Sequence, residues 1–229
     1  ALLHSINIQE KKNMLRVWNT ILIMLTFALT IFGTFLTRSG VMSSVHSFTE
    51  SPLGPIFLAF VAIIVTVCAI LVFQGLPKMK SDKHIESLTS RESGFLFNNV
   101  VFVTMCFAVF WGTIFPVISE AVRGTKITVG PPFFNQVNVP IGLLLLMLTG
   151  VGPLLAWRRT SRSNFIKYFS IPVGLALIAA IVFLLFGFRG YVVISLTLSV
   201  FVVVAIITEF KRGIQARVNR FGESSFVAF

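Results

Sequence analysis

Six long runs of apolar residues constrain this chain more than any other feature of its sequence. A helix needs roughly 20 apolar residues to cross the hydrocarbon core of a bilayer. The runs are rich in Leu, Ile, Val and Phe, none contains a charged residue, and they cover 17–36, 55–73, 95–118, 141–157, 168–186 and 191–207. We therefore predict an all-α, polytopic integral membrane protein with about six transmembrane helices in this stretch of chain.

The composition excludes the common soluble classes. Only 12% of the 229 residues are charged and 55% are hydrophobic, whereas a soluble domain carries roughly 25% charged residues. The two cysteines, Cys68 and Cys106, are too few for a disulfide framework and lie inside apolar runs. A soluble globular domain, a disordered tail and a disulfide-stapled secreted module are all excluded.

The basic residues alternate between the segments that connect the apolar runs. Fifteen of the 19 Lys and Arg residues lie in 1–16, 74–94, 158–167 and 208–229, and four lie on the other side: Arg38, Arg123, Lys126 and Arg189. By the positive-inside rule the first set of segments faces the cytoplasm. The net charge of +11 is therefore explained by topology, and we expect no binding of nucleic acid.

This topology defines the organisation that we expect along the chain. Two outer segments, 37–54 and 119–140, are long enough to carry function, while 187–190 is a tight turn. Residues 1–3 resemble the end of a helix and residues 224–229 the start of another span, so we expect both ends to be cut. The expected parts are 1–16, 17–73 (with 37–54), 74–94, 95–157 (with 119–140), 158–167, 168–207 and 208–229.

Two of the three histidines are candidate ligands. His4 lies in the apolar start of the chain, in or near the inner leaflet, where a histidine is costly and needs a partner. It either hydrogen-bonds to a neighbouring helix or serves as an axial ligand to a metal or heme. His84 lies in a polar inner loop and is interpreted as an ordinary surface residue.

His46 lies in a short amphipathic pattern in the first outer segment. Helical spacing places Val41, Val45 and Phe48 on one face, and His46 with Glu50 on the other. Such an element lies on the outer membrane surface and holds His46 toward the water. An ordinary surface histidine and a ligand oriented by Glu50 both remain open.

The two outer segments contain basic residues, and the second also contains aromatic ones. Arg38 of the first segment and Arg123 and Lys126 of the second face outward, where they either extend to the interface or bind a carboxylate or propionate group. We interpret 125–135 as an extended piece followed by a rigid turn with two exposed aromatics, Phe133 and Phe134. This turn is either packed on the membrane or a contact surface for a partner.

Several motifs of other function classes are absent from the sequence. There is no CxxCH for covalent heme, no CxxC for dithiol exchange and no phosphate-binding loop. We expect Glu120 and Glu209 at helix ends, so that no carboxylate lies within a span. An ion-coupled transporter would normally place charges inside the membrane, and this argues against transport.

Eight short stretches together resemble the CcmF family, the heme-lyase subunit of the cytochrome c maturation (system I) machinery. They are ALLHS (1–5), GTFLTRSGV (33–41), SVHSF (44–48), SRES (90–93), NN (98–99), GT (112–113), PFFN (132–135) and GVGPL (150–154). The resemblance covers nearly the whole chain, which is similar to the middle part of such a protein.

The resemblance implies a function and two heme ligands. Such subunits receive heme from a heme chaperone at the outer face and join it to the CxxCH thiols of apocytochrome c, which a thiol-reducing subunit presents. By this resemblance His46 matches a ligand of the substrate heme, and His4 matches a ligand of a resident heme b. The family's tryptophan-rich segment, its first outer histidine and its second transmembrane histidine have no match here.

The resemblance also implies a location in the bacterial inner membrane, or in the mitochondrial inner membrane for a plant protein. It implies a thioether-forming enzyme, incomplete in this stretch of chain, that needs no acid–base or nucleophile set because the thiols and the heme supply the reacting groups. The alternative from the residues alone is a non-enzymatic membrane scaffold or transporter core whose histidines are structural.

Overall fold

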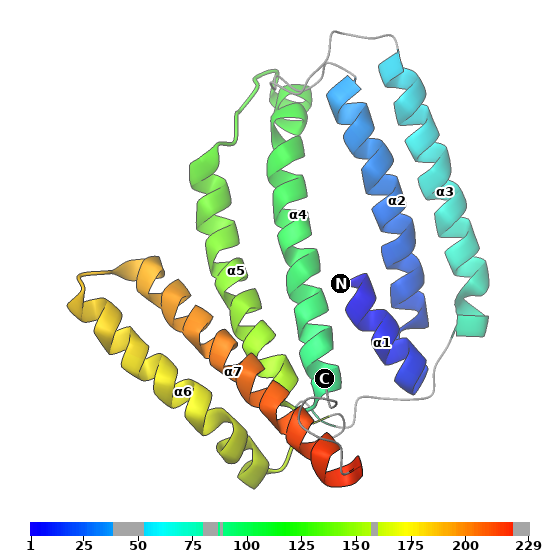
Figure 1. Cartoon of the computed structure of the whole chain (residues 1–229). Coiled ribbons are helices and arrows are strands. Elements are labelled where there is room, and N and C mark those ends of the chain that lie inside the picture. Colours follow the sequence, from blue (N-terminus) through cyan, green and yellow to red (C-terminus); the bar gives the residue numbers. More distant parts are fainter. Residues whose placement is uncertain (39–52, 80–86, 88, 157–159, 222–229) are drawn as a thin grey trace. The chain divides into compact units, whose positions relative to one another are not determined.

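The computed structural model describes residues 1–38, 53–79, 87, 89–156 and 160–221. Within these ranges the structure contains helices and no strand (Figure 1). The helices are α1 (Leu2–Lys12), α2 (Arg16–Arg38), α3 (Leu53–Met79), α4 (Arg91–Arg123), α5 (Pro131–Leu154), α6 (Arg162–Leu185) and α7 (Gly190–Phe221). The predicted all-α class is confirmed.

Six of these helices, α2 to α7, are long and apolar enough to cross a membrane, as the six apolar runs predicted. The end of the fourth run, at Trp157, lies outside the described residues. The helices α4 and α7 have 33 and 32 residues, which at roughly 1.5 Å per residue exceeds the hydrocarbon thickness of roughly 30 Å. Their ends therefore extend beyond the hydrocarbon core.

The second outer segment is mostly helical, which corrects our interpretation of 119–140 and of 125–135. Helix α4 continues to Arg123 and α5 begins at Pro131, so that only 124–130 are non-helical. A proline at the start of a helix lacks an N–H that would be unpaired there anyway, and its fixed φ suits the first turn. Phe133 and Phe134 are half-buried on α5, with ring centroids 5.5 Å apart.

The inner end of the last span is also helical, which corrects the expected position of one carboxylate. Helix α7 continues past the apolar run to Phe221, so that Glu209 lies within the helix and not at its end. The expected position of Glu120, three residues before the end of α4, is confirmed.

The chain forms two compact units. Unit 1 consists of residues 1–84 and 109–131, and unit 2 consists of residues 85–108 and 132–229. Unit 1 thus contains α1, α2, α3 and the second part of α4, while unit 2 contains the first part of α4 with α5, α6 and α7. In unit 1, α2 and α3 run in opposite directions (Figure 1). In unit 2, the chain direction alternates from α5 to α6 and from α6 to α7.

Unit 1 opens with a hairpin of α1 and α2. Asn13 ends α1 with a left-handed backbone (φ 58°) and donates its N–H to the Gln9 carbonyl at 2.7 Å, a conformation that asparagine tolerates better than most residues. Its side-chain oxygen accepts from the Arg16 guanidinium. The Asn19 amide donates to Gln9 Oε1 at 2.6 Å and joins the two helices.

Unit 2 has a buried apolar cluster where α5, α6 and α7 meet. It contains Leu154, Leu155, Phe169, Ala176, Phe201, Val202 and Ala205. A Cβ at Gly150 would lie 2.5 Å from the Phe201 ring, so α5 and α7 approach closely only because this residue is glycine. The predicted tight turn between α6 and α7 is confirmed, and Gly187 and Gly190 adopt positive φ there.

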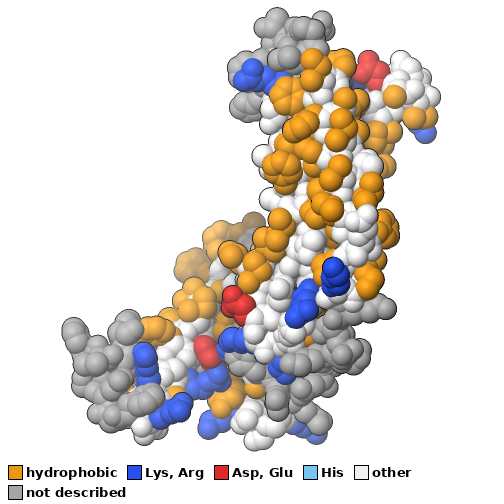
Figure 2. Space-filling view, turned by 90° about the vertical axis from the view of Figure 1, so that its right-hand side faces the viewer, with side chains coloured by type: hydrophobic (Ala, Val, Ile, Leu, Met, Phe, Trp, Pro, Cys, Tyr) orange, Lys and Arg blue, Asp and Glu red, His pale blue; other side chains and the backbone are white. Residues whose placement is uncertain are grey.

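The surface is apolar along the helices. On the face shown in Figure 2, hydrophobic side chains cover the middle of the long helices, while Lys and Arg lie toward helix ends. In α3 none of the most apolar stretch is buried inside the chain. A surface of this kind matches the hydrocarbon of a bilayer and the apolar faces of other membrane helices.

Candidate functional site

The site begins at His4, which lies on α1 beside the buried face of this helix. Ser5 and Ile8 are almost fully buried, whereas Leu3 is 79% exposed, and His4 is half-buried between these two faces. The Ser5 hydroxyl donates to the carbonyls of Ala1 and Leu2. Helix α1 is not one of the six candidate spans.

Burial lowers the pKa of His4 below its ordinary value, because a charged imidazolium loses solvation there. The imidazole is therefore neutral at neutral pH, which is the form that binds heme iron. In the part of the chain that the structure describes, no three His, Cys, Asp or Glu side chains gather into a metal site. A heme iron needs only axial ligands from the protein, so the donor chemistry of His4 fits a heme.

The other two histidines, His46 and His84, lie outside the described residues. So do Glu50 and the amphipathic pattern that begins at Val41. The outer histidine element therefore stays a prediction.

Three outward basic residues of the prediction belong to unit 1. Arg38 ends α2, Arg123 ends α4, and Lys126 lies in the 124–130 connection, and all three are exposed. This connection is fastened to α4, because Ser119 Oγ accepts the Ile127 N–H at 2.9 Å. The structure thus places the three residues in one compact unit.

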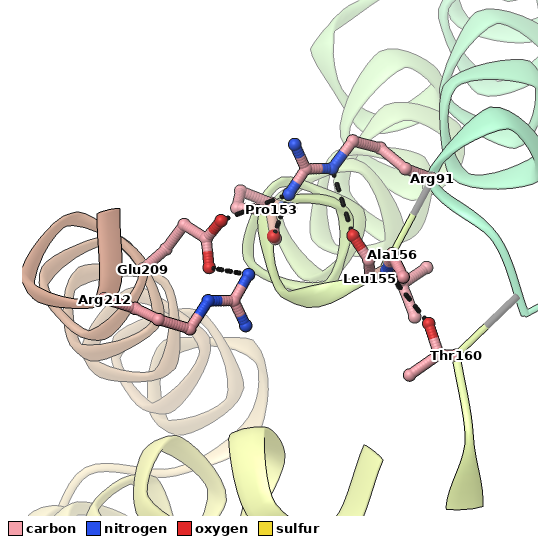
Figure 3. A network of polar contacts seen from close by, with 7 residues as sticks. All are labelled: Arg91, Pro153, Leu155, Ala156, Thr160, Glu209 and Arg212. Atoms are coloured by element: carbon pink, nitrogen blue, oxygen red, sulfur yellow. Dashed lines mark hydrogen bonds and ion pairs between the residues drawn. The ribbon is translucent and has the colours of Figure 1, made fainter. Parts of the chain in front are cut away.

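Sequence reasoning missed a polar network in unit 2, at the start of α4. Arg91 donates through Nε to the Leu155 carbonyl at 3.1 Å and through a terminal nitrogen to the Pro153 carbonyl at 2.5 Å (Figure 3). The same terminal nitrogen lies 3.2 Å from Glu209 of α7. One guanidinium therefore caps the last carbonyls of α5 and joins α4, α5 and α7.

Glu209 carries a second arginine. Arg212, three residues later on α7, lies 2.6 Å from the other oxygen of Glu209 and stacks 4.2 Å from the Tyr168 ring centroid of α6. The Thr160 hydroxyl accepts the Ala156 N–H at 2.9 Å and closes the end of α5 (Figure 3). Arg91 and Arg212, two of the fifteen basic residues of the inner segments, therefore pair with a carboxylate within the fold.

A signal for this network was present in the sequence. Glu209 is the acidic residue that follows the sixth apolar run, and a carboxylate at the membrane boundary is stable only with a cationic partner. Pro153, two residues before Leu155, predicts a helix end whose carbonyls need donors. The sequence did not say which of the fifteen inner basic residues supplies them.

Comparison with known proteins places these observations in a family. No family model matches the chain. Cytochrome c-type biogenesis protein CycK of Bradyrhizobium diazoefficiens is 37% identical over 159 residues, covering 69% of this chain and 24% of that protein. CcmF of Pseudomonas aeruginosa is 35% identical over 214 residues, covering 92% of this chain and 32% of that protein.

A solved structure agrees with the sequence relatives. The cytochrome c heme lyase CcmF superimposes with a TM-score of 0.71 and 30% sequence identity, over 94% of this chain and 31% of that chain. Together with the six candidate spans, this defines a multi-pass α-helical membrane protein. The chain belongs to the CcmF family and spans about a quarter to a third of the length of the curated relatives it matches.

Proposed function

We propose that this chain is part of the membrane subunit of a cytochrome c heme lyase in the bacterial inner membrane. In this role the subunit takes heme from a heme chaperone at the outer face and joins it to the CxxCH thiols of apocytochrome c. The observation that carries the proposal is the match to the heme lyase CcmF along 94% of the chain. A thiol-reducing subunit presents the apocytochrome.

His4 is the proposed protein ligand of a resident heme b. Its neutral imidazole and its half-buried position on α1 support this role. When bound, this heme supplies an electron that keeps the incoming heme iron reduced. The hairpin of α1 and α2 determines where the imidazole lies, through the hydrogen bond between Gln9 and Asn19.

His46 is the proposed ligand of the substrate heme at the outer face. Its support is the SVHSF stretch and the outward placement that the charge pattern predicts. Arg38, Arg123 and Lys126 are the proposed contacts for the heme propionates or for a partner, since a guanidinium or ammonium pairs with a carboxylate. All three belong to unit 1.

The bond-forming step needs little chemistry from the protein. Each thiol adds across a heme vinyl group, with sulfur bonding to one carbon and the thiol hydrogen to the other, so that no electrons are gained or lost overall. The task of the chain is to hold the heme and the CxxCH segment in register, since positioning alone removes much of the barrier.

The test is a reduced-minus-oxidised visible spectrum of the full-length protein, as wild type, His4→Ala and His46→Ala. We expect the b-type heme signal to disappear in His4→Ala and to remain in His46→Ala, while cytochrome c assembly is lost in both. His84→Ala is the matched control and should behave as wild type. A folded His4→Ala variant that keeps its heme would make His4 structural and favour a scaffold role.

A further inference from the structure

A second candidate site lies in unit 2, and none of the residues that line it has been given a role in heme handling. It is an open cavity of about 540 Å³ along the second half of α7. Its wall is formed by Pro153 at the end of α5 and by Ile206 and Phe210 of α7. Further along α7 the wall continues with Gly213, Ile214 and Arg217.

The cavity lies at the depth where hydrocarbon gives way to headgroups. Helix α7 begins at Gly190, and at roughly 1.5 Å per residue about 20 residues cross the hydrocarbon core. The boundary therefore falls near Glu209 and Phe210. Ile206 and Phe210 lie at acyl-chain depth, and Gly213 to Arg217 lie at headgroup depth on the side that the charge pattern places in the cytoplasm.

The charge at this depth is positive. Lys211, Arg212, Arg217 and Arg220 all lie on the last three turns of α7. The carboxylate of Glu209 also lines the cavity, but it is shared between Arg91 and Arg212, so these three groups together carry one positive charge (Figure 3). The cavity thus combines an apolar upper wall with a cationic lower one.

Gly213 provides room between these two walls. A Cβ built at Gly213 meets no atom within 4 Å, so the space in front of this residue is open. The helix dihedrals do not require glycine here, since Gly213 is not among the residues with positive φ. Gly213 therefore leaves open space in the groove at headgroup depth.

We propose that this cavity binds an anionic phospholipid of the inner leaflet. Its phosphodiester lies against Arg217, and its acyl chains follow Ile206 and Phe210 toward the bilayer centre. Basic pockets between membrane helices on the cytoplasmic side suit such headgroups, since each Lys or Arg near the surface favours an anionic lipid. A zwitterionic lipid gains the apolar contact but not the net attraction.

The test is lipid titration of the delipidated full-length protein, followed by native mass spectrometry with phosphatidylglycerol and phosphatidylcholine as probes. Wild type should bind phosphatidylglycerol more tightly than phosphatidylcholine. Arg217→Gln should weaken phosphatidylglycerol binding about fivefold, and Arg217→Lys should restore it. Gly213→Leu should remove the tightest site by filling the groove, and it does not endanger folding because leucine favours a helix more than glycine.

Lys211→Gln is the matched control, because Lys211 is exposed on the same helix end and does not line the cavity. It should leave the affinity for phosphatidylglycerol within about twofold of wild type. Equal losses of affinity in Arg217→Gln and Lys211→Gln would mean that phosphatidylglycerol responds to the overall positive charge of the helix end and not to this cavity. That result would overturn the proposal. Unchanged binding in Gly213→Leu, or equal affinity for the two lipids, would overturn it as well.

Discussion

The two units differ in what their residues do. Unit 1 holds the described residues for which a heme-related role is proposed, namely His4, Arg38, Arg123 and Lys126. Unit 2 holds the buried apolar cluster and the network around Arg91. None of the most apolar stretch of α3 is buried inside the chain, whereas 22% of the most apolar stretch of α7 is buried. One unit carries the proposed ligand and an apolar surface, and the other has a buried core of its own.

This difference follows from the distribution of small and polar residues. In unit 2, Gly150 allows α5 to approach α7, and Arg91 joins the start of α4 to the end of α5 and to Glu209 within α7. In unit 1, an apolar cavity of about 290 Å³ lies between α2 and α3, with Ile21, Val65 and Phe73 among the side chains that line it. Unit 1 therefore depends more on surrounding lipid or protein for its packing.

The largest effect on the difference between the two units is expected from Arg91→Ala, which tests whether the polar network stabilises unit 2. It removes the donor to two α5 carbonyls and leaves Glu209 with one arginine. Hydrogen bonds of charged groups contribute about 1.5–3 kcal/mol each, and the Arg91 and Glu209 side chains are only 22% and 26% exposed. We expect a loss of about 3 kcal/mol in unfolding free energy, measured by denaturant titration in detergent.

The control for this prediction is Arg91→Lys, which keeps the charge near Glu209 but not the planar fork. It should recover less than half of the loss, since the two carbonyls are bound by two different nitrogens of the guanidinium and lysine has only one. If Arg91→Ala unfolds like wild type, the network contributes no stability and unit 2 rests on its apolar cluster alone.

The second prediction concerns the close approach of α5 and α7. Gly150→Ala should destabilise the protein by about 1–3 kcal/mol, because the new Cβ would lie 2.5 Å from the Phe201 ring and overlap it sterically. The smaller ring-free side chain in Gly150→Ala/Phe201→Leu should recover part of this loss. Gly152→Ala is the matched control, since a Cβ there meets nothing within 4 Å. Equal effects at Gly150 and Gly152 would contradict the packing argument.

The sequence predicted the spanning helices and failed at their ends. Apolar runs such as 17–36 and 168–186 are unambiguous, because a bilayer admits little else than a helix of that length. The positions of the helix ends depend on polar residues and prolines, whose conformation is determined by the residues packed around them. Pro131 and Pro132 were interpreted as a turn but begin α5, and Glu209 was placed at a helix end but lies inside α7.

The candidate site was only partly predictable for a related reason. The imidazole of His4 was recognised as a candidate ligand from its apolar surroundings, and its half-buried position agrees with them. The Arg91 network was missed, because the contact joins residues 118 positions apart. A count of basic residues separates the two sides of the membrane but does not distinguish an exposed lysine from a half-buried structural arginine such as Arg91.

The smallest expected effect on stability, and the sharpest test of unit 1, is Asn19→Ala. Asn19 is 4% exposed and its amide donates to Gln9 across the hairpin that carries His4. Losing this bond should cost about 1 kcal/mol, yet it should also lower the heme b absorbance, because α1 is then less firmly held. Asn7→Ala is the control, since the Asn7 side chain is exposed and donates within α1 to the Leu3 carbonyl. If Asn19→Ala loses stability but retains the full heme signal, the hairpin has a structural role and does not position the ligand.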